Sequence, residues 1–274
     1  MSFSRYHLVL VNGDGTHKHP LWSAPRTYAE VSGSGSGLSG LPAWNPTGSK
    51  LAVAVPDSRL PAPRSSSHGP GYVIWVIDAG TGTSRQLADE RHHPLEAAYD
   101  SAVTWNPAGT MLAYVAADNA LTLVGAGGGS TTPLSGPSSS KAFATLSWSP
   151  ANAFILTITI APPTNKSQFS GSGTLSLYPI HGGPARTITV STSMPDAAYY
   201  SPDGRQIIVA VDNLQPAGTP SPPPFSGPRT GPTASLLVAN ADGSHAAALP
   251  NLASFSYRDT LTGWVLVPGL GVSR

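Results

Sequence analysis

Four stretches of the chain are apolar at consecutive positions rather than at alternate ones. In the segment 51–55 every residue is Leu, Ala or Val, and the segment 155–160 combines Ile and Leu with two Thr. A strand that is apolar on both faces is typical of a sheet covered by other layers on both sides. The pattern therefore predicts short strands, each enclosed between two neighbouring layers.

A turn motif precedes each of these strands. It consists of an aromatic residue, Asn or Ser, Pro, any residue, and then Gly or Asn, which are the side chains that a type I turn favours. The four copies align without a gap and comprise Trp44, Pro46 and Gly48; Trp105, Pro107 and Gly109; Trp148, Pro150 and Asn152; and Tyr200, Pro202 and Gly204. Asn152 takes the place of Gly because Asn tolerates a positive φ better than other residues with a side chain. We interpret these residues as structural corners of hairpins.

A second pattern follows each turn motif and consists of a strand, a Gly-containing turn and a closing strand. Its copies cover 74–87, 121–134, 175–188 and 236–249, and a fifth copy runs from Leu8 to Leu21 with no turn motif before it. The segment 252–268 offers Phe255 and Tyr257 followed by an apolar run from Trp264, without the Pro-Gly turn. The two ends of the chain are thus expected to form one unit together.

Units of four strands with aromatic and turn residues in fixed places are typical of a β-propeller. The fold class is therefore all-β, in a single domain over 1–274 with about five four-stranded blades. The expected blades are 41–88, 101–135, 143–191, 196–250, and a composite of 5–22 with 252–268 that closes the ring. Combining the two chain ends in one blade removes the exposed edges of an open array.

The turn motif resembles the TolB-type, WD40-like propeller repeat, often called the PD40 repeat. Ser201-Pro202-Asp203-Gly204 carries its full form, while the other copies have Thr47, Ala108 and Ala151 in place of Asp. The resemblance covers most of the chain and implies a propeller in an envelope, periplasmic or secreted setting. The N-terminal residues show no signal-peptide pattern, which favours the cytoplasm by default. The compartment is left open between these two indications.

The composition agrees with strands joined by many turns. The 29 Gly and 28 Pro make up about a fifth of the 274 residues and only 11% are charged, which disfavours a helical bundle. A net charge of +1 gives no field that would attract nucleic acid, and no apolar run is long enough to cross a membrane. There is no cysteine, and His17 and His19 are too few for a metal site, so no cofactor or metal is expected.

Blade geometry sorts the connections between strands onto two faces. The first-to-second and third-to-fourth connections are tight, whereas the others are long and include 23–40, 56–71, 88–101, 161–173 and 212–233. Binding residues gather on loops that a rigid scaffold carries, so the long-loop face is the expected binding face. The candidate binding residues there are Arg64, His68, His92, His93, Tyr99, Asp100, Asp196 and Phe225.

The function expected from these features is a monomeric, non-enzymatic scaffold that binds a protein or peptide partner through the long-loop face. No linear catalytic pattern is present, so no catalytic residue is assigned. Two alternatives stay open. One is a carbohydrate-active or other small-molecule hydrolase or binder with Asp100 and Asp196 at the channel mouth. The other is that the chain is the propeller or sensor portion of a longer envelope protein.

Overall fold

The computed structural model describes residues 7–24, 42–56, 72–90, 103–116, 120–136, 142–160, 173–190, 194–212 and 235–249. Every regular element in these ranges is a β-strand. The first nine strands are β1 His7–Leu10, β2 His19–Ser23, β3 Ala43–Trp44, β4 Lys50–Pro56, β5 Tyr72–Asp78, β6 Ser84–Glu90, β7 Val103–Trp105, β8 Met111–Val115 and β9 Leu121–Gly125. The other nine are β10 Thr131–Pro133, β11 Ala142–Trp148, β12 Phe154–Ile160, β13 Gly173–Pro179, β14 Arg186–Ile188, β15 Met194–Tyr200, β16 Gln206–Asp212, β17 Ser235–Asn240 and β18 Ala247–Ala248.

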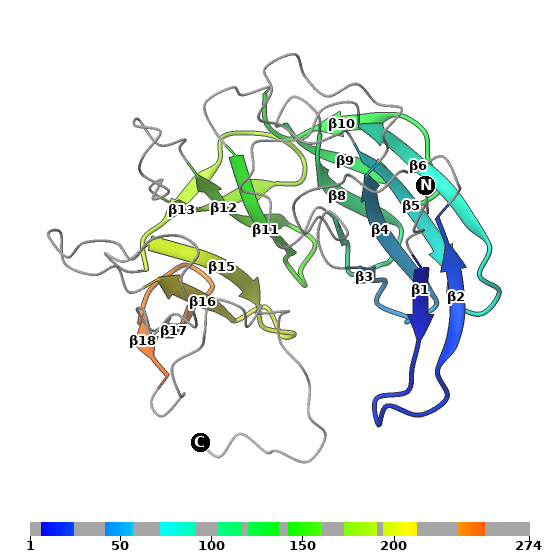
Figure 1. Ribbon diagram of the computed structural model, residues 1–274. Coiled ribbons are helices and arrows are strands. Elements are labelled where there is room, and N and C mark those ends of the chain that lie inside the picture. The colour runs from blue at the N-terminus through cyan, green and yellow to red at the C-terminus, as the bar shows by residue number, and fades with distance from the viewer. Residues whose placement is uncertain are drawn as a thin grey trace, which may run out of the picture.

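The strands form four antiparallel sheets of four strands each and one two-stranded hairpin. The four-stranded sheets are β3 to β6, β7 to β10, β11 to β14 and β15 to β18, each paired in chain order, and the hairpin is β1 with β2. The sheets follow one another in an arc around a common centre, with the first strand of each sheet innermost (Figure 1). This is the predicted all-β propeller. Of the predicted composite blade, 252–268 lies outside the described residues.

One register recurs in all four sheets. The aromatic residue of the turn motif pairs with the residue seven positions later, as in Trp44 with Leu51 and Tyr200 with Ile207. The residue that lies ten positions after the aromatic residue forms a pair with a residue of the third strand, as Ala54 does with Ile74. The corresponding pairs elsewhere are Trp105 with Leu112, Trp148 with Ile155, Val115 with Leu121, Ile158 with Leu175, and Ala210 with Leu236. The repeat in sequence is therefore a repeat in strand pairing.

The turn motif closes through its own side chains. In the first copy, Gly48 N donates to Asn45 O over 3.0 Å, and Lys50 N donates to Asn45 Oδ1 over 2.8 Å. Gly48 has a φ of +69°, and Asn152 takes the same place in the third copy with a φ of +55°. The polar residue after the aromatic thus satisfies backbone donors, and the last residue supplies the left-handed conformation that Gly and Asn tolerate.

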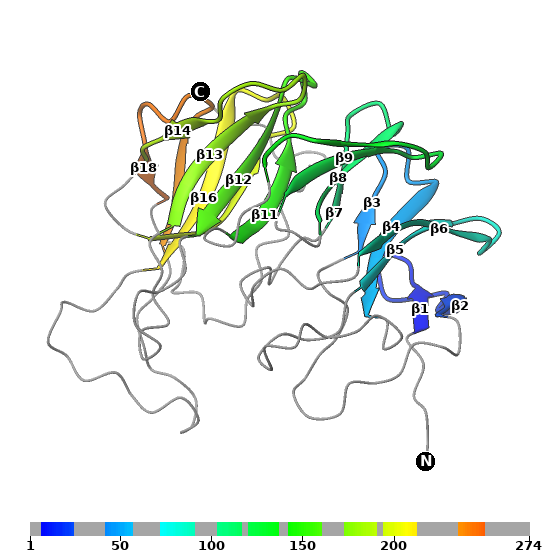
Figure 2. The ribbon, with the colours of Figure 1, turned by 90° about the horizontal axis from the view of Figure 1, so that it is seen from above.

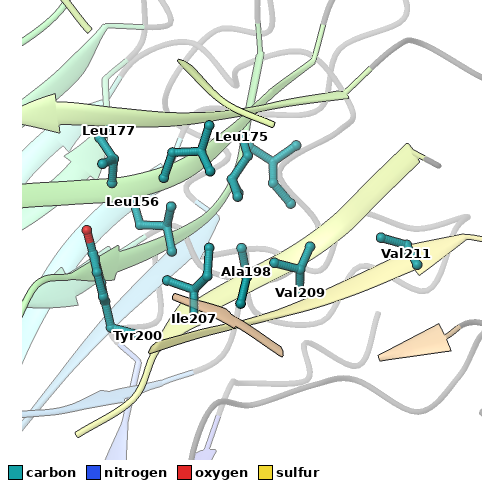
Figure 3. Close-up of a cluster of buried hydrophobic side chains, with 11 residues drawn as sticks. Leu156, Leu175, Leu177, Ala198, Tyr200, Ile207, Val209 and Val211 are labelled. Carbon is teal, nitrogen blue, oxygen red and sulfur yellow. The ribbon is translucent and has the colours of Figure 1, made fainter. Parts of the chain in front are cut away.

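The hydrophobic core lies between neighbouring blades. Figure 3 shows Leu156, Leu175 and Leu177 of the third four-stranded sheet facing a set of apolar side chains from the fourth. That set comprises Ala198, Tyr200, Ile207, Val209 and Val211. Equivalent clusters join the first sheet to the second and the second to the third. In the first three four-stranded sheets, both faces of the second strand are covered in this way, which explains why these strands are apolar at consecutive positions.

The two edges of the arc differ in their connections. The eight connections that join a first strand to a second or a third strand to a fourth are tight turns, and they lie at one edge. The connection from β8 to β9 at the other edge is also short and is closed by a hydrogen bond from Ala116 N to Ala120 O. The strand ends that lead into the undescribed segments 25–41, 57–71, 91–102, 161–172 and 213–234 share the opposite edge (Figure 2). We call this opposite edge the long-segment face.

Candidate binding site on the propeller axis

A cavity of about 760 Å³ lies where the innermost strands meet. Its walls come from β3, β7, β11 and β15, and β1 borders one side. The lining residues are Leu8, Val9, Leu10, Leu21, Pro42, Ala43, Trp44, Pro46, Leu51, Val103, Thr104, Trp105, Leu146, Ser147, Trp148 and Tyr199. Because the motif aromatics end their strands beside the tight turns, the cavity lies toward the tight-turn end of the axis.

The lining is aromatic and uncharged. Three Trp and Tyr199 contribute rings from four different sheets, while Thr104 and Ser147 contribute hydroxyl groups. None of the lining residues is Asp, Glu, His, Lys or Arg. The described cavity therefore supports apolar and aromatic contacts with a few neutral hydrogen bonds, which is the chemistry typical of binding pockets. Sequence reasoning missed this cavity, because the motif aromatics had been interpreted only as structural corners.

The motif tryptophans bind neighbouring sheets in different ways. Trp105 Nε1 donates a hydrogen bond of 2.9 Å to Ala43 O on β3, so it joins the first two four-stranded sheets at the axis. Trp148 is equally buried at the same repeat position, yet its Nε1 has no hydrogen-bond partner among the residues that the structure describes. Trp44, the copy on β3, is 48% exposed. Identical motif positions thus have three different environments.

Hydroxyl groups join the innermost strands of the third and fourth sheets. Thr145 Oγ1 accepts a hydrogen bond from Ala198 N over 3.2 Å, and Ser147 Oγ accepts one from Tyr200 N over 3.1 Å. The edge amides of β15 are buried here and need such acceptors. Thr145 is the extra residue of a bulge in β11, which places its side chain between the two sheets. These contacts give the wall of the cavity a fixed geometry.

Tyr200 ends β15 at the interface between the third and fourth sheets. Burial raises the pKa of its hydroxyl to about 12, while the positive charge of Arg186 acts in the opposite direction. The hydroxyl is therefore protonated throughout the physiological range. Tyr200 acts at this interface as a neutral aromatic side chain rather than as an acid or base.

Asp196 is the one predicted binding residue whose backbone the structure describes. It lies in β15 between Pro195, which pairs with Val211, and Ala197, which pairs with Ala210, so it is the extra residue of a bulge in an innermost strand. Bulges are frequent next to binding sites because they redirect the strand and its side chains. The other predicted binding residues lie outside the described residues: Arg64, His68, His92, His93, Tyr99, Asp100 and Phe225.

Exposed carboxylates cap turns at the tight-turn edge. Asp203 Oδ1 accepts hydrogen bonds from Ser201 Oγ over 2.6 Å and from Arg205 N over 3.1 Å. These bonds, with that of Ser201 first, hold the pKa of the Asp203 carboxyl below its ordinary value. The pKa values of Asp14, Asp78 and Asp242 are lowered by the same kind of turn hydrogen bonds. The clear role of these carboxylates is to stabilise turns.

Asp203→Asn is expected to flatten the acid side of the stability profile. The folded-state pKa of Asp203 is lower than that of the unfolded chain, so its contribution is present above the unfolded pKa and is lost as the pH falls through the folded one. The melting temperature measured from about pH 6 to about pH 3 should therefore fall less steeply in the variant than in the parent. Parallel profiles would contradict the assignment.

No group of three or more metal-binding side chains occurs among the described residues. His17 and His19 make only local contacts. The Nδ1 atom of His17 lies 2.9 Å from Asn12 Nδ2 and from Thr16 Oγ1, and His19 Nδ1 lies 3.1 Å from His17 O. His17 thus belongs to the turn of the β1–β2 hairpin, and His19 begins β2. Within the described ranges there is also no helix that could span a membrane.

Solved structures that superpose on this chain include TolB and several enzymes. TolB from Acinetobacter baumannii superposes with a TM-score of 0.56 at 15% identity, over 90% of this chain and 49% of TolB. This chain has the β-propeller fold of TolB. The resemblance seen in the turn motif is thus confirmed for the fold. No protein-family model and no curated protein matches the sequence.

Two further neighbours are named as enzymes. An oligogalacturonate lyase in complex with manganese gives a TM-score of 0.57 at 13% identity, over 88% of this chain and 58% of the lyase. The GH74 enzyme of Niastella koreensis gives 0.55 at 13% identity, over 88% of this chain and 33% of that enzyme. The chain therefore spans less than two thirds of the length of each of these three neighbours, and the likeness at such identity concerns the fold.

These neighbours overturn the prediction that the chain is not an enzyme. That prediction was based on the lack of linear catalytic motifs, and it was wrong to treat this lack as decisive, since enzymes are found among the solved structures that are similar to this chain. Catalytic groups are recognised by their geometry and can come from separate elements of a fold. In a TolB-like propeller they could be supplied by different blades without any contiguous signature.

Proposed function

We propose that this TolB-like propeller binds a protein or peptide partner on its long-segment face. The observation that carries the proposal is the asymmetry of the connections. The first-to-second and third-to-fourth connections are short and lie at one edge, and the connections of more than ten residues leave from the other. Rigid scaffolds commonly present binding residues on such connections.

The described scaffold supports this function by its rigidity. Buried side chains from neighbouring sheets form continuous clusters, and hydrogen bonds from Trp105, Thr145 and Ser147 join the innermost strands. A scaffold fixed in this way lets binding segments vary without loss of the fold. The TolB resemblance also favours an envelope or secreted setting, in which the partner would be another envelope protein.

The test uses peptides selected by display against the intact protein. One variant replaces 57–71 and 213–234 with short Gly-Ser linkers, and a matched control carries Thr47→Ala and Thr81→Ala in exposed tight turns at the other edge. Binding of the selected peptides should be lost in the first variant and retained in the control. Retained binding in the first variant, or its loss in the control, would contradict the proposal.

A second candidate function is the binding or processing of an oligosaccharide at the channel mouth. It is favoured by the bulge that places Asp196 in an innermost strand at the end of the axis away from the tight turns. Carboxylates at the mouth of a channel are suited to contacting sugar hydroxyls or to general acid and base catalysis. Asp100 precedes the innermost strand of the second four-stranded sheet and is its predicted companion.

Calorimetric titration with a panel of oligosaccharides, including oligogalacturonate, tests this candidate. Asp196→Asn should weaken binding at least tenfold, and turnover of any bound sugar should fall with it. Asp203→Asn is the matched control, because its carboxylate is exposed in a tight turn at the opposite edge. Equal effects of the two substitutions, or no binding by the parent protein, would exclude this candidate.

A further inference from the structure

The large hydrophobic side chains that are exposed among the described residues gather at the open side of the arc. They are Val9, Val11, Trp44 and Leu249. Val9 lies in β1, and Val11 directly follows that strand. Trp44 ends β3, and Leu249 directly follows β18. Figure 1 shows that β1 and β18 lie on the two sides of the opening in the arc. Exposed apolar groups concentrated in one place indicate a surface that another element covers.

The repeat shows that these positions are buried elsewhere. Trp44 is 48% exposed, whereas Trp105 and Trp148 are 6% exposed at the same position of the motif. Leu249 is 37% exposed, and its equivalents Leu134 and Ile188 are 8% and 6% exposed. In the complete interfaces a neighbouring blade covers these residues. The exposure of Trp44 and Leu249 therefore results from their place beside the opening in the arc and not from their residue type.

The hairpin β1–β2 stands in the position of the third and fourth strands of a blade. A Cβ added at Gly82, in a tight turn of the first four-stranded sheet, would lie 2.5 Å from Leu21 O on β2. Gly243, at the same place in the fourth sheet, lies in the same way against Ile188 on β14. The hairpin therefore packs on the first sheet as β13 and β14 pack on the fourth, and no described strand pairs with the free edge of β1.

The core cluster at the hairpin lacks the contribution of that second strand. Its apolar residues from the hairpin include Leu8, Leu10 and Leu21, which match Leu175, Leu177 and Ile188 in the complete interface. The complete interfaces also contain two residues of the second strand. These are Ala52 and Ala54, Ala113 and Val115, and Leu156 and Ile158. No described residue takes their place beside β1.

The segment 252–268 has the residues that these positions require. Tyr257 occupies the position of the motif aromatic in this segment. Trp264 to Val267 follow it seven to ten positions later, just as Leu51 to Ala54 follow Trp44. The two residues that fill the core at positions eight and ten would be Val265 and Val267. All four residues are apolar, as both faces of a second strand demand.

We propose that residues 255–267 complete the blade begun by β1 and β2 and thereby cover Trp44. The recurring register sets the pairing: Tyr257 lies opposite Trp264, and Val267, Leu266 and Val265 lie opposite Leu8, Val9 and Leu10. The segment brings Tyr257 to the axis as a fifth motif aromatic.

Disulfide formation in the full-length chain tests the register, since the protein has no cysteine of its own. One double variant carries Val9→Cys and Leu266→Cys, and a second carries Leu10→Cys and Val265→Cys. Opposite residues alternate between closer and wider pairs along an antiparallel ladder, so one of the two variants has the favourable spacing. The matched control carries Val9→Cys and Val265→Cys, which are one position out of register and point to opposite faces.

Mild oxidation of the monomer should form an intramolecular disulfide in at least one in-register variant and none in the control. Amide exchange of residues 7–11 in the parent should also be slow, as expected for a strand that is paired on both edges. Disulfides in neither in-register variant, equal yields in the control, or disulfides only between two copies of the chain would overturn the proposal. The last result would show that a second copy covers the surface. None of these outcomes depends on the proposed binding function.

Discussion

Gly82→Ala is expected to lower the melting temperature by about 5 °C or more, because the substitution meets two obstacles at once. Gly82 has a φ of +69°, and a side chain in the left-handed region costs about 1–2 kcal/mol. The added Cβ would also lie 2.5 Å from Leu21 O, a backbone atom that no rotamer change can move. Overpacking of this kind costs about a further 1–3 kcal/mol.

Gly48→Ala is the matched control for this prediction. Gly48 has the same φ of +69°, but a Cβ there meets no atom within 4 Å. Its loss of stability should therefore be limited to about 1–2 kcal/mol of backbone strain. Thermal unfolding of both variants, followed by circular dichroism, separates the two causes. Equal losses would show that β2 does not pack against this turn as the structure describes.

Trp105→Phe is expected to cost about 1–3 kcal/mol more than Trp148→Phe, because only the first removes a hydrogen bond between sheets. Trp105 Nε1 donates to Ala43 O over 2.9 Å, and the substitution leaves that carbonyl oxygen without this donor. Trp148 is equally buried, but its Nε1 has no hydrogen-bond partner in the described part of the chain, so its removal relieves an unsatisfied group. The change in ring size is identical in both substitutions.

The free energy of unfolding from urea titration measures this difference. Both variants create a small cavity at an interface between sheets, so that contribution cancels approximately in the comparison. The result expected is a lower denaturation midpoint for Trp105→Phe with an unchanged m-value. A loss in Trp148→Phe that equals or exceeds the loss in Trp105→Phe would refute the role assigned to the bond with Ala43.

The strand order and the turns could be predicted from the sequence because they depend on neighbouring residues. The motif beginning at Trp44 or Tyr200 contains its own capping side chain and its own residue for positive φ, and both act within five positions. Apolar residues on both faces then indicated the enclosed second strands. The propeller followed because only stacked sheets of this kind cover such strands.

The binding site was predicted less well, and the reasons are physical. The axial cavity depends on residues such as Trp44, Trp105 and Trp148, which stand in three different sheets and meet only after folding. The bond from Trp105 to Ala43 spans 62 positions of the chain. The enzyme prediction failed for the same reason, since separate blades can supply catalytic groups that no linear motif reveals.

The sequence by itself determined the blade repeat and the turn chemistry, because both arise from interactions within a few neighbouring residues. Only the tertiary structure decided which copies of the motif are buried. Trp105 is covered because a complete blade precedes it, and Trp44 is exposed because the described hairpin supplies only two strands there. Burial depends on the neighbour around the ring, and the repeat alone does not specify that neighbour.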